Sequence, residues 1–387
     1  MPLVAELSLC MIVRNEAKHL DACLASARPW VGEIVVVDTG SSDDSRAIAC
    51  RWGARLFETP WCGDFSLARN FSLQQARFPW ILVLDGDERL EVDDPHWKQQ
   101  LVVTPADTLG FRLPITLHPE WTATEVLRLF RNRADLRYSG VIHEQLPLQQ
   151  QPESCVQPLQ KVQLQHVPYD RAHFESKLSR NCEHLERHRL AHPHDHFQLW
   201  HLARIQLEIG NLERAALLLD EMARAIASPG QSTGTRPGAL ASARLRLEAF
   251  RYELALARTL SPDAERALCS AAALEFPRCP FFSLGAARAS RQLGRHAEAL
   301  QWYRHTYRLW RSGRYDRTLI YRHTQIGPGS LMAAGQLLAI LGRQQLAGRV
   351  VGEAARQASA LAAAAAPTTK DGAQSQQAWA PAEPPRR

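Results

Sequence analysis

The sequence contains no long hydrophobic run and no paired-cysteine motif, and its first residues are not expected to act as a leader. No apolar run in the 387 residues approaches the roughly 20 residues that a membrane-spanning helix requires. The eight cysteines are scattered without a Cys-x-x-Cys pair, which fits a reducing compartment better than a disulfide scaffold. The N-terminal MPLVAELSLCMIVRNE becomes charged too soon for a signal peptide. We therefore expect a cytoplasmic protein, and peripheral contact with a membrane stays open.

The charge is mildly basic and is not concentrated in one segment. Lys and Arg number 46 against 40 Asp and Glu, a net charge of +6, and the excess is spread over arginine-rich helical segments. This distribution is typical of solvated helix faces, so no nucleic-acid partner is predicted. The length exceeds one typical domain, and an apolar content of 45% is ordinary for a globular protein. Two domains and a tail are expected.

The first half of the sequence alternates short β-branched runs with amphipathic segments. Leu7–Val13 is a continuous apolar run of the kind that forms a strand buried on both faces of a parallel sheet. Apolar residues then recur at helical spacing from Leu20 to Ala27. This alternation predicts an α/β domain over residues 1–195, with a Rossmann-like and mostly parallel sheet. The further expected elements are the strands Glu33–Asp38, Ala54–Glu58 and Trp80–Asp85 and the helices Ser45–Trp52 and Ser66–Ala76.

Residues 196–360 contain helical patterns alone. Three segments share a glycine followed five residues later by an alanine, and each lies between two apolar-periodic runs. They resemble tetratricopeptide (TPR) repeats, in which small residues let paired helices pack closely, and a plain helical bundle is the alternative. Residues 361–387 are rich in Ala, Pro, Gln and Thr and are expected to be disordered. The glycine–alanine pairs are Gly210/Ala215, Gly294/Ala299 and Gly342/Ala347, with interruptions expected near Ser228–Gly238 and after Trp310.

Polar residues follow three of the expected strands. The first strand runs into Arg14-Asn15-Glu16, the second ends at Asp38, and the Trp80 strand runs into Asp85-Gly86-Asp87. Ligands of open parallel sheets collect outside the carboxyl ends of the strands, so these residues are expected to form one composite site.

The Asp-Gly-Asp turn predicts a metal site. Two carboxylates two residues apart, with a glycine between them, can present oxygens to a hard cation such as Mg²⁺ or Mn²⁺. Such a cation usually takes its remaining ligands from water and phosphates, which suits a diphosphate leaving group.

At this point the sequence resembles the family 2 glycosyltransferases of the GT-A fold. The resemblance rests on SLCMIVRNEAKHLDACLAS, EIVVVDTGSSDDS, WCGDFSLARNFSL and WILVLDGDE, and it covers roughly residues 5–185. RLFRN, RYSGVIHEQL and LQHVPY further resemble bacterial enzymes of the peptide S-glycosyltransferase and lipopolysaccharide-core type.

The resemblance implies roles for the residues that match its motifs. Asp38 would hydrogen-bond the nucleobase, Asp85 would lie near the ribose and diphosphate, and Asp87 would bind the metal. Four further residues are expected to contact the nucleotide sugar, and for Arg69 a salt bridge with Asp64 or another neighbour is the alternative. These four are Asn15, Glu16, Arg69 and Asn70.

The extra metal ligand and the general base each have two candidates. Related enzymes use a late histidine on the metal, and His143 lies where that ligand is expected, with His166 as its competitor. Inverting transfer needs a base that takes the acceptor proton. Glu125 matches the family position although the usual Glu-Asp pair is absent, and Glu144 is the alternative.

The sequence therefore predicts a metal-dependent, inverting glycosyltransferase that uses a nucleotide-diphosphate sugar, with a UDP-sugar favoured. The helical repeats are expected to hold a peptide, glycolipid or polysaccharide acceptor, or to drive dimerisation. A catalytically silent TPR adaptor with a relic transferase domain is the alternative, although its acidic strand ends are intact. A nucleotidyltransferase is disfavoured because RNEAKHL is not a glycine-rich loop.

Overall fold

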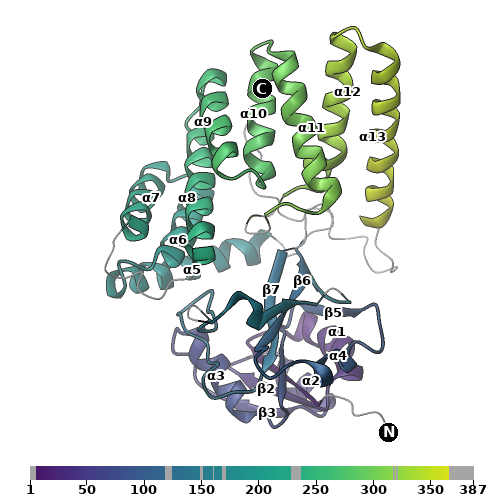
Figure 1. Cartoon of the computed structure of the whole chain (residues 1–387). Helices are drawn as coiled ribbons and strands as arrows, with labels where there is room; N and C mark the ends of the chain where they lie inside the picture. The colour runs from purple at the N-terminus through teal and green to yellow at the C-terminus, as the bar shows by residue number, and fades with distance from the viewer. Residues whose placement is uncertain are drawn as a thin grey trace.

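The computed structural model describes residues 6–117, 124–148, 151–159, 161–167, 171–227, 237–316, 319 and 321–365. They form a sheet domain followed by a series of helices, and Figure 1 shows these two parts one above the other. Helix α5 (Arg171–Ala191) lies at the junction, and α6 (His196–Glu208) begins the helical part. The domain boundary predicted at residue 195 thus falls between two helices.

The described strands form one mixed sheet of nine strands in the order β3-β2-β1-β4-β7-β6-β9-β5, with β8 paired to β6. β1 pairs in parallel with β2 and β4, and β2 pairs in parallel with β3. β7 is antiparallel to β4 and β6, and β5 is antiparallel to β9. The predicted α/β fold with a mostly parallel N-terminal sheet is confirmed. The strands are β1 (Leu7–Val13), β2 (Glu33–Asp38), β3 (Arg55–Glu58), β4 (Trp80–Val83), β5 (Glu88–Val92), β6 (Gly110–Thr116), β7 (Thr124–Arg131), β8 (Val156–Pro158) and β9 (Val162–His166).

Helices cover both faces of this sheet. Alternate residues of β1 point to opposite faces, so Leu9 lies in the core under α1 (Ala17–Ala27), α2 (Ser45–Arg51) and α4 (Lys98–Val103). Cys10 lies in the core on the other face, which α3 (Phe65–Gln75) covers. Both faces of the parallel half are therefore buried, as its continuous apolar runs require.

The register places the carboxyl ends of three strands at one edge. Val13 of β1 pairs with Asp38 of β2, and Cys10 pairs with Val83 of β4. The fourth predicted strand is shorter than expected: β4 ends at Val83, and Asp85 lies in the turn to β5, where the Glu88 N–H donates to the Asp85 carbonyl at 3.0 Å. This turn lets both aspartates face the same edge.

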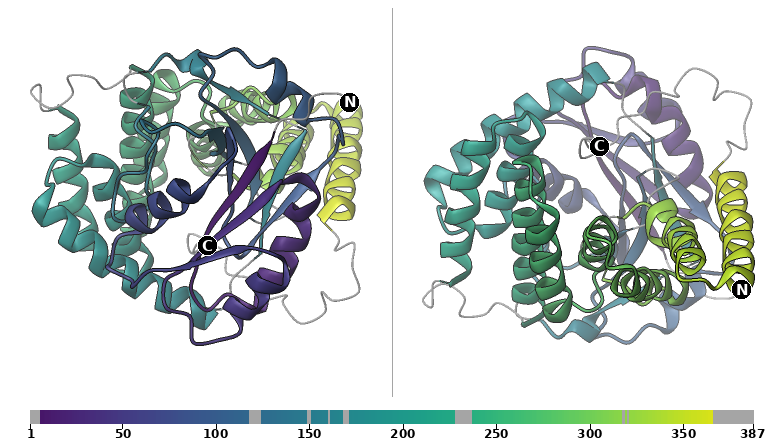
Figure 2. Two further views of the ribbon diagram at one scale, coloured as in Figure 1. Left: turned by 90° about the horizontal axis from the view of Figure 1, so that it is seen from below. Right: turned by 90° about the horizontal axis from the view of Figure 1, so that it is seen from above.

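The C-terminal part consists of antiparallel helix pairs, as the TPR-like repeat predicted. Gly210, Gly294 and Gly342 have φ of 80°, 71° and 77°. This left-handed conformation ends one helix and lets the chain turn into the next helix. Their partner alanines are buried between the paired helices. Seen from above, the helices follow one another in an arc (Figure 2). The helices are α6, α7 (Leu212–Ala227), α8 (Pro237–Ala257), α9 (Pro262–Glu275), α10 (Pro280–Gln292), α11 (His296–Ser312), α12 (Ser330–Ile340) and α13 (Gln344–Ala365).

The tail was predicted to begin at residue 361, which is too early because this residue still lies in helix α13. Helix α13 continues to Ala365, since its alanine-rich sequence has high helix propensity. Residues 366–387 and residues 228–236 of the expected loop lie outside the described residues, and α8 begins at Pro237. No helix in the described ranges is long and apolar enough to cross a membrane.

Candidate functional site

Hydrogen bonds hold the first two strand ends together. Asn15 has φ of 57°, a left-handed conformation that asparagine adopts more readily than most residues. Its Oδ1 accepts from the Ser42 N–H at 2.8 Å, and its own N–H donates to Ser41 Oγ at 3.0 Å. The Glu16 N–H donates to Ser45 Oγ at 2.8 Å. The structure thus brings Asn15 and Glu16 to the Asp38 loop, and the Asn15 side chain braces that loop.

Asp38 ends β2 with one oxygen engaged and the other without a partner. Oδ1 accepts from the N–H groups of Gly40 at 3.0 Å and Ser41 at 2.9 Å. Oδ2 is buried, and none of the described residues hydrogen-bonds to it. A buried acceptor in this state is costly unless a ligand satisfies it.

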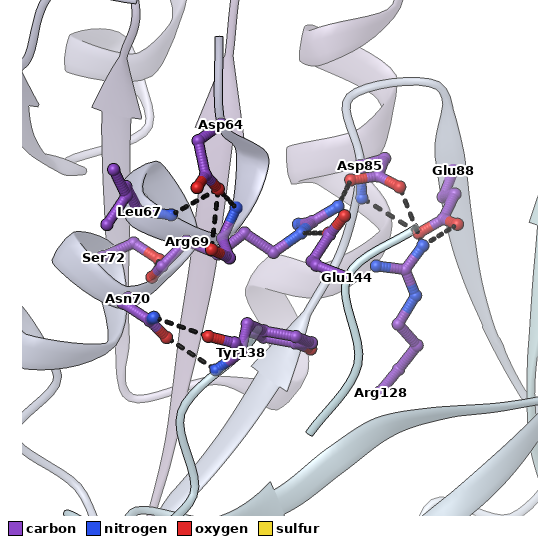
Figure 3. A network of polar contacts seen from close by, with 11 residues as sticks. Asp64, Leu67, Arg69, Asn70, Ser72, Asp85, Glu88, Arg128, Tyr138 and Glu144 are labelled. Atoms are coloured by element: carbon purple, nitrogen blue, oxygen red, sulfur yellow. Dashed lines mark hydrogen bonds and ion pairs between the residues drawn. The ribbon is translucent and has the colours of Figure 1, made fainter. Parts of the chain in front are cut away.

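Asp85 lies between two guanidinium groups (Figure 3). Its Oδ1 is 2.6 Å from Arg69 Nη2, and its Oδ2 is 2.7 Å from Arg128 Nη2. Burial by itself raises the pKa of Asp85, but the guanidiniums of Arg128 and Arg69 hold this pKa well below its usual range. The centre of the site therefore holds an ionised carboxylate balanced by two cations.

Arg128 reaches Asp85 from a β-bulge and was not among the predicted site residues. Across β6 and β7, Phe111 pairs with Leu129 and Arg112 pairs with Leu127, so Arg128 is the extra residue of the bulge. A bulge redirects side chains and often lies beside an active site. Arg128 Nη2 also lies 2.9 Å from Glu88 Oε1. The only sign of Arg128 in the sequence was its place as an arginine in an expected strand after the Asp-Gly-Asp turn.

Arg69 links Asp85 to a second carboxylate. Its Nε donates to Glu144, and its side chain is 7% exposed. Asp64, the partner considered from the sequence, caps α3 by accepting from the Ser66 N–H at 2.8 Å. The salt bridges of Arg69 therefore go to carboxylates of the site itself.

Asn70 positions the segment that carries Glu144. Its Nδ2 donates to the Tyr138 carbonyl at 2.9 Å, and the Tyr138 N–H donates to Asn70 Oδ1 at 2.8 Å (Figure 3). Both ends of the Asn70 amide are thus used to hold residue 138, six positions before Glu144. The sequence identified Asn70 but did not indicate this positioning contact.

His166 lies beside Asp87. The Asp87 side chain is buried, and its Oδ2 is 3.4 Å from His166 Nε2. Pairing of β5 with β9 sets this contact, because His166 pairs with Glu88 and the Val167 N–H donates to the Asp87 carbonyl at 2.8 Å. Across the described chain, no three His, Cys, Asp or Glu side chains form a ready metal cluster. The protein therefore supplies two adjacent candidate ligands.

Glu16 and Lys177 face this acidic pair of aspartates. Burial, together with the negative charges of Asp87 and Asp85, raises the pKa of Glu16 to about 7. Burial lowers the pKa of Lys177, on α5, while the charges of Asp87 and Asp85 act in the opposite direction. Lys177 was not predicted, since it lies ninety residues after Asp87 in a helix without a motif.

The remaining two candidates lie on separate segments. His143 has φ of 52°, and its ring stacks on His201 of α6 with centroids 3.5 Å apart and an interplanar angle of 10°. Burial lowers the pKa of His143 to about 4, so its imidazole is neutral at pH 7. Glu125 lies on β7 opposite Pro114 of β6, three positions before Arg128.

Comparison with known proteins finds a family match for the first part of the sheet domain. Residues 8–102 match the profile of the family described as Glycosyl transferase family 2. This segment is therefore similar in sequence to the family 2 glycosyltransferases. It contains Asp38, Arg69, Asp85 and Asp87, whereas Arg128, Glu144 and His166 follow it in the chain.

Relatives with curated names share parts of the chain. A TPR repeat-containing protein of Synechococcus elongatus is 37% identical over 226 residues, 55% of this chain and 55% of that protein. The SPbeta prophage-derived glycosyltransferase SunS of Bacillus subtilis is 28% identical over 143 residues, 35% of this chain and 33% of that protein. The chain thus spans about half or less of these relatives' lengths.

Among solved structures, glucosyl-3-phosphoglycerate synthase from Mycobacterium tuberculosis in complex with Mn²⁺, UDP and glucosyl-3-phosphoglycerate aligns with a TM-score of 0.34. It is 16% identical, and the alignment covers 46% of this chain and 80% of that chain.

Proposed function

We propose that the chain transfers a sugar, with inversion, from a nucleotide-diphosphate donor to a hydroxyl or thiol acceptor, and that UDP is the nucleotide. The observation that carries this proposal is the convergence of Asp38, Asp85 and Asp87 at one edge of a family 2 domain. The unpartnered Oδ2 of Asp38 suits an imide N–H such as that of uracil. A relic domain would have no reason to retain such an arrangement.

A divalent cation fits the residues beside the turn. Asp87 and His166 offer a carboxylate and an imidazole 3.4 Å apart, and Mg²⁺ or Mn²⁺ bound by few protein groups takes its other ligands from water and phosphates. We propose these two residues as the protein ligands, in preference to His143. When bound, the cation would neutralise charge on the departing diphosphate.

Side chains of the site would orient the reactants. Arg69 and Arg128 hold Asp85 ionised, and Arg69 also holds Glu144. We propose Glu144 as the base that takes the acceptor proton, because it belongs to the same ion-pair network as Asp85. Glu125 is the second candidate. Glu144→Gln and Glu125→Gln separate these two candidates. The variant that lacks the base should lose sugar transfer but still bind UDP, whereas the other variant should keep both.

We further propose that the protein is cytoplasmic and that its helical repeats bind the acceptor. The described residues contain no disulfide, which fits a reducing compartment. The repeats are proposed to hold the acceptor, with dimerisation as their second proposed role.

A hydrolysis screen over several UDP-sugars with Mn²⁺ tests the proposal. Asp87→Asn should reduce donor turnover at least tenfold, whereas Asp94→Asn, a surface change seven residues later, should leave it unchanged. Equal turnover and equal metal dependence in the two variants would show that the metal site is assigned wrongly.

A further inference from the structure

An aromatic and basic cluster lies where the helical part meets the transferase domain. We define this junction cluster as His143, Phe197, Trp200, His201 and Arg246. The His143 ring stacks on His201, and the rings of Phe197 and Trp200 each meet His201 edge-on with centroids 4.7 Å apart. His143 comes from the transferase side, and the other four residues come from α6 and α8.

The guanidinium of Arg246 has no ionic partner in this cluster. Its central carbon lies 5.2 Å from the Phe197 ring centroid and 5.4 Å from that of Trp200. Among the residues with described positions, none forms a hydrogen bond or salt bridge with Arg246, and the one acidic group whose charge acts on it is that of Asp316. By contrast, Arg204, which also lies over Trp200, is paired with Glu253.

The cation–π contacts of Arg246 with Phe197 and Trp200 do not use its N–H groups. A guanidinium presents its donors in its own plane, in a fork that matches a carboxylate or phosphate. Burial lowers the pKa of Arg246, which means that the cation is held in a costly, partly dehydrated position. An arginine in this state is prepared to bind an anion.

The junction cluster is directly connected to the proposed base. Gln198 of α6 donates from Nε2 to the Ile142 carbonyl at 2.7 Å, and Ile142 is buried in the core of the helical part. His143 follows Ile142, and Glu144 is next, in contact with Arg69. The His143 side chain still contacts solvent, although the protein atoms around it lower its pKa to about 4.

We propose that the junction cluster is the acceptor subsite and that Arg246 binds a carboxylate or phosphate group on an acceptor sugar. This inference rests on the proposed glycosyl transfer and specifies its acceptor as an anionic sugar unit. The half-buried Phe197 and Trp200 rings would contact the C–H face of the sugar, while Arg246 binds its charged substituent. The accepting hydroxyl would then lie beside Glu144.

Calorimetry with three small probes tests the proposal on the full chain. D-glucose 6-phosphate and D-glucuronate should each bind at least about tenfold more tightly than D-glucose, because a charge-assisted hydrogen bond adds to the contact. Arg246→Gln should remove this preference. Arg251→Gln, on the same helix and paired only at the surface with Glu248, should keep it. Which of the two charged sugars binds better distinguishes a phosphate from a carboxylate acceptor.

Two further measurements separate binding from packing. The imidazole NMR signals of His143 and His201 should shift on addition of the charged sugars to wild type but not to Arg246→Gln. UDP binding should be the same in both proteins. If wild type binds UDP yet neither charged sugar is preferred, or Arg246→Gln keeps the preference, the cluster is only packing and the inference is wrong. Stronger binding of an acidic peptide than of both sugars would also overturn it, whereas absence of UDP binding would instead contradict the proposed function.

Discussion

Replacing Arg69 by methionine removes the cation that joins Asp85 to Glu144. Methionine retains much of the apolar stem, so the change is mainly the loss of charge and hydrogen bonds. The Arg69 side chain is 7% exposed, and those of Glu144 and Asp85 are 10% and 34% exposed. Glu144 would lose its guanidinium partner in a nearly buried position, whereas Asp85 would keep Arg128.

The expected cost of Arg69→Met lies near the lower end of the range for broken buried ion pairs. Breaking such a pair costs about 3–5 kcal/mol, and the retained Arg128 contact favours a value of about 3 kcal/mol. For a domain of this size each kcal/mol lowers Tm by about 2–4 °C, so we expect a fall of about 6–12 °C. Thermal unfolding followed by circular dichroism measures this change.

Arg133→Met is the matched control, because Arg133 pairs with Asp135 at the surface with side chains 46% and 54% exposed. An exposed pair contributes little, so this variant should unfold close to wild type. If Arg69→Met unfolds at the same temperature as Arg133→Met, the ion-pair network does not stabilise the site and the reasoning is refuted.

Three further changes test separate contacts. In metal-free protein, Glu16→Gln should match the stability of wild type at pH 4 and exceed it by about 1–3 kcal/mol at pH 8. The reason is that the pKa of Glu16 is about 7 in the folded protein, so wild type loses stability as the pH rises from the pKa of unfolded Glu to 7. Urea unfolding at both pH values measures this, and an equal stability difference at both would contradict it. Gly86→Ala places a Cβ 2.9 Å from Glu16 Cγ and 3.0 Å from Glu16 Cβ, so it should cost about 1–3 kcal/mol by urea unfolding. Glu16→Ala in the same chain should relieve part of this loss, because alanine lacks Cγ but keeps Cβ. Asp38→Asn keeps the Oδ1 acceptor but puts an amide donor at the Oδ2 position. Calorimetry should therefore show UDP binding that is at least about tenfold weaker, while Tm stays near that of wild type. Unchanged UDP affinity would show that Asp38 does not bind the nucleobase.

The parallel half of the sheet could be predicted because its signals are local. The apolar runs of β1 and β2 match Leu7–Val13 and Glu33–Asp38, and each glycine turn of the repeats lies beside an alanine that packs between helices. β5 and β9 were not predicted, since they are short, alternate polar with apolar residues and depend on pairing across seventy residues. The mixed half of the sheet is therefore a tertiary feature.

Site residues at the ends of strands could be predicted from the sequence. Site residues whose positions depend on long-range packing could not. Asp38, Asp85 and Asp87 follow from the strand-end pattern alone. Arg128 required knowledge of a bulge, and the proximity of His166 to Asp87 required the β5–β9 register. The stacking of His143 on His201 depends on how α6 docks, for which the sequence holds no local signal.

Binding of UDP to the full chain, measured by calorimetry with and without Mn²⁺, tests the central claim most directly. The account predicts saturable binding that weakens at least tenfold when Mn²⁺ is removed by a chelator or when Asp87 is replaced by asparagine. No heat of binding at millimolar UDP with Mn²⁺ present would contradict the account and favour a catalytically silent TPR adaptor.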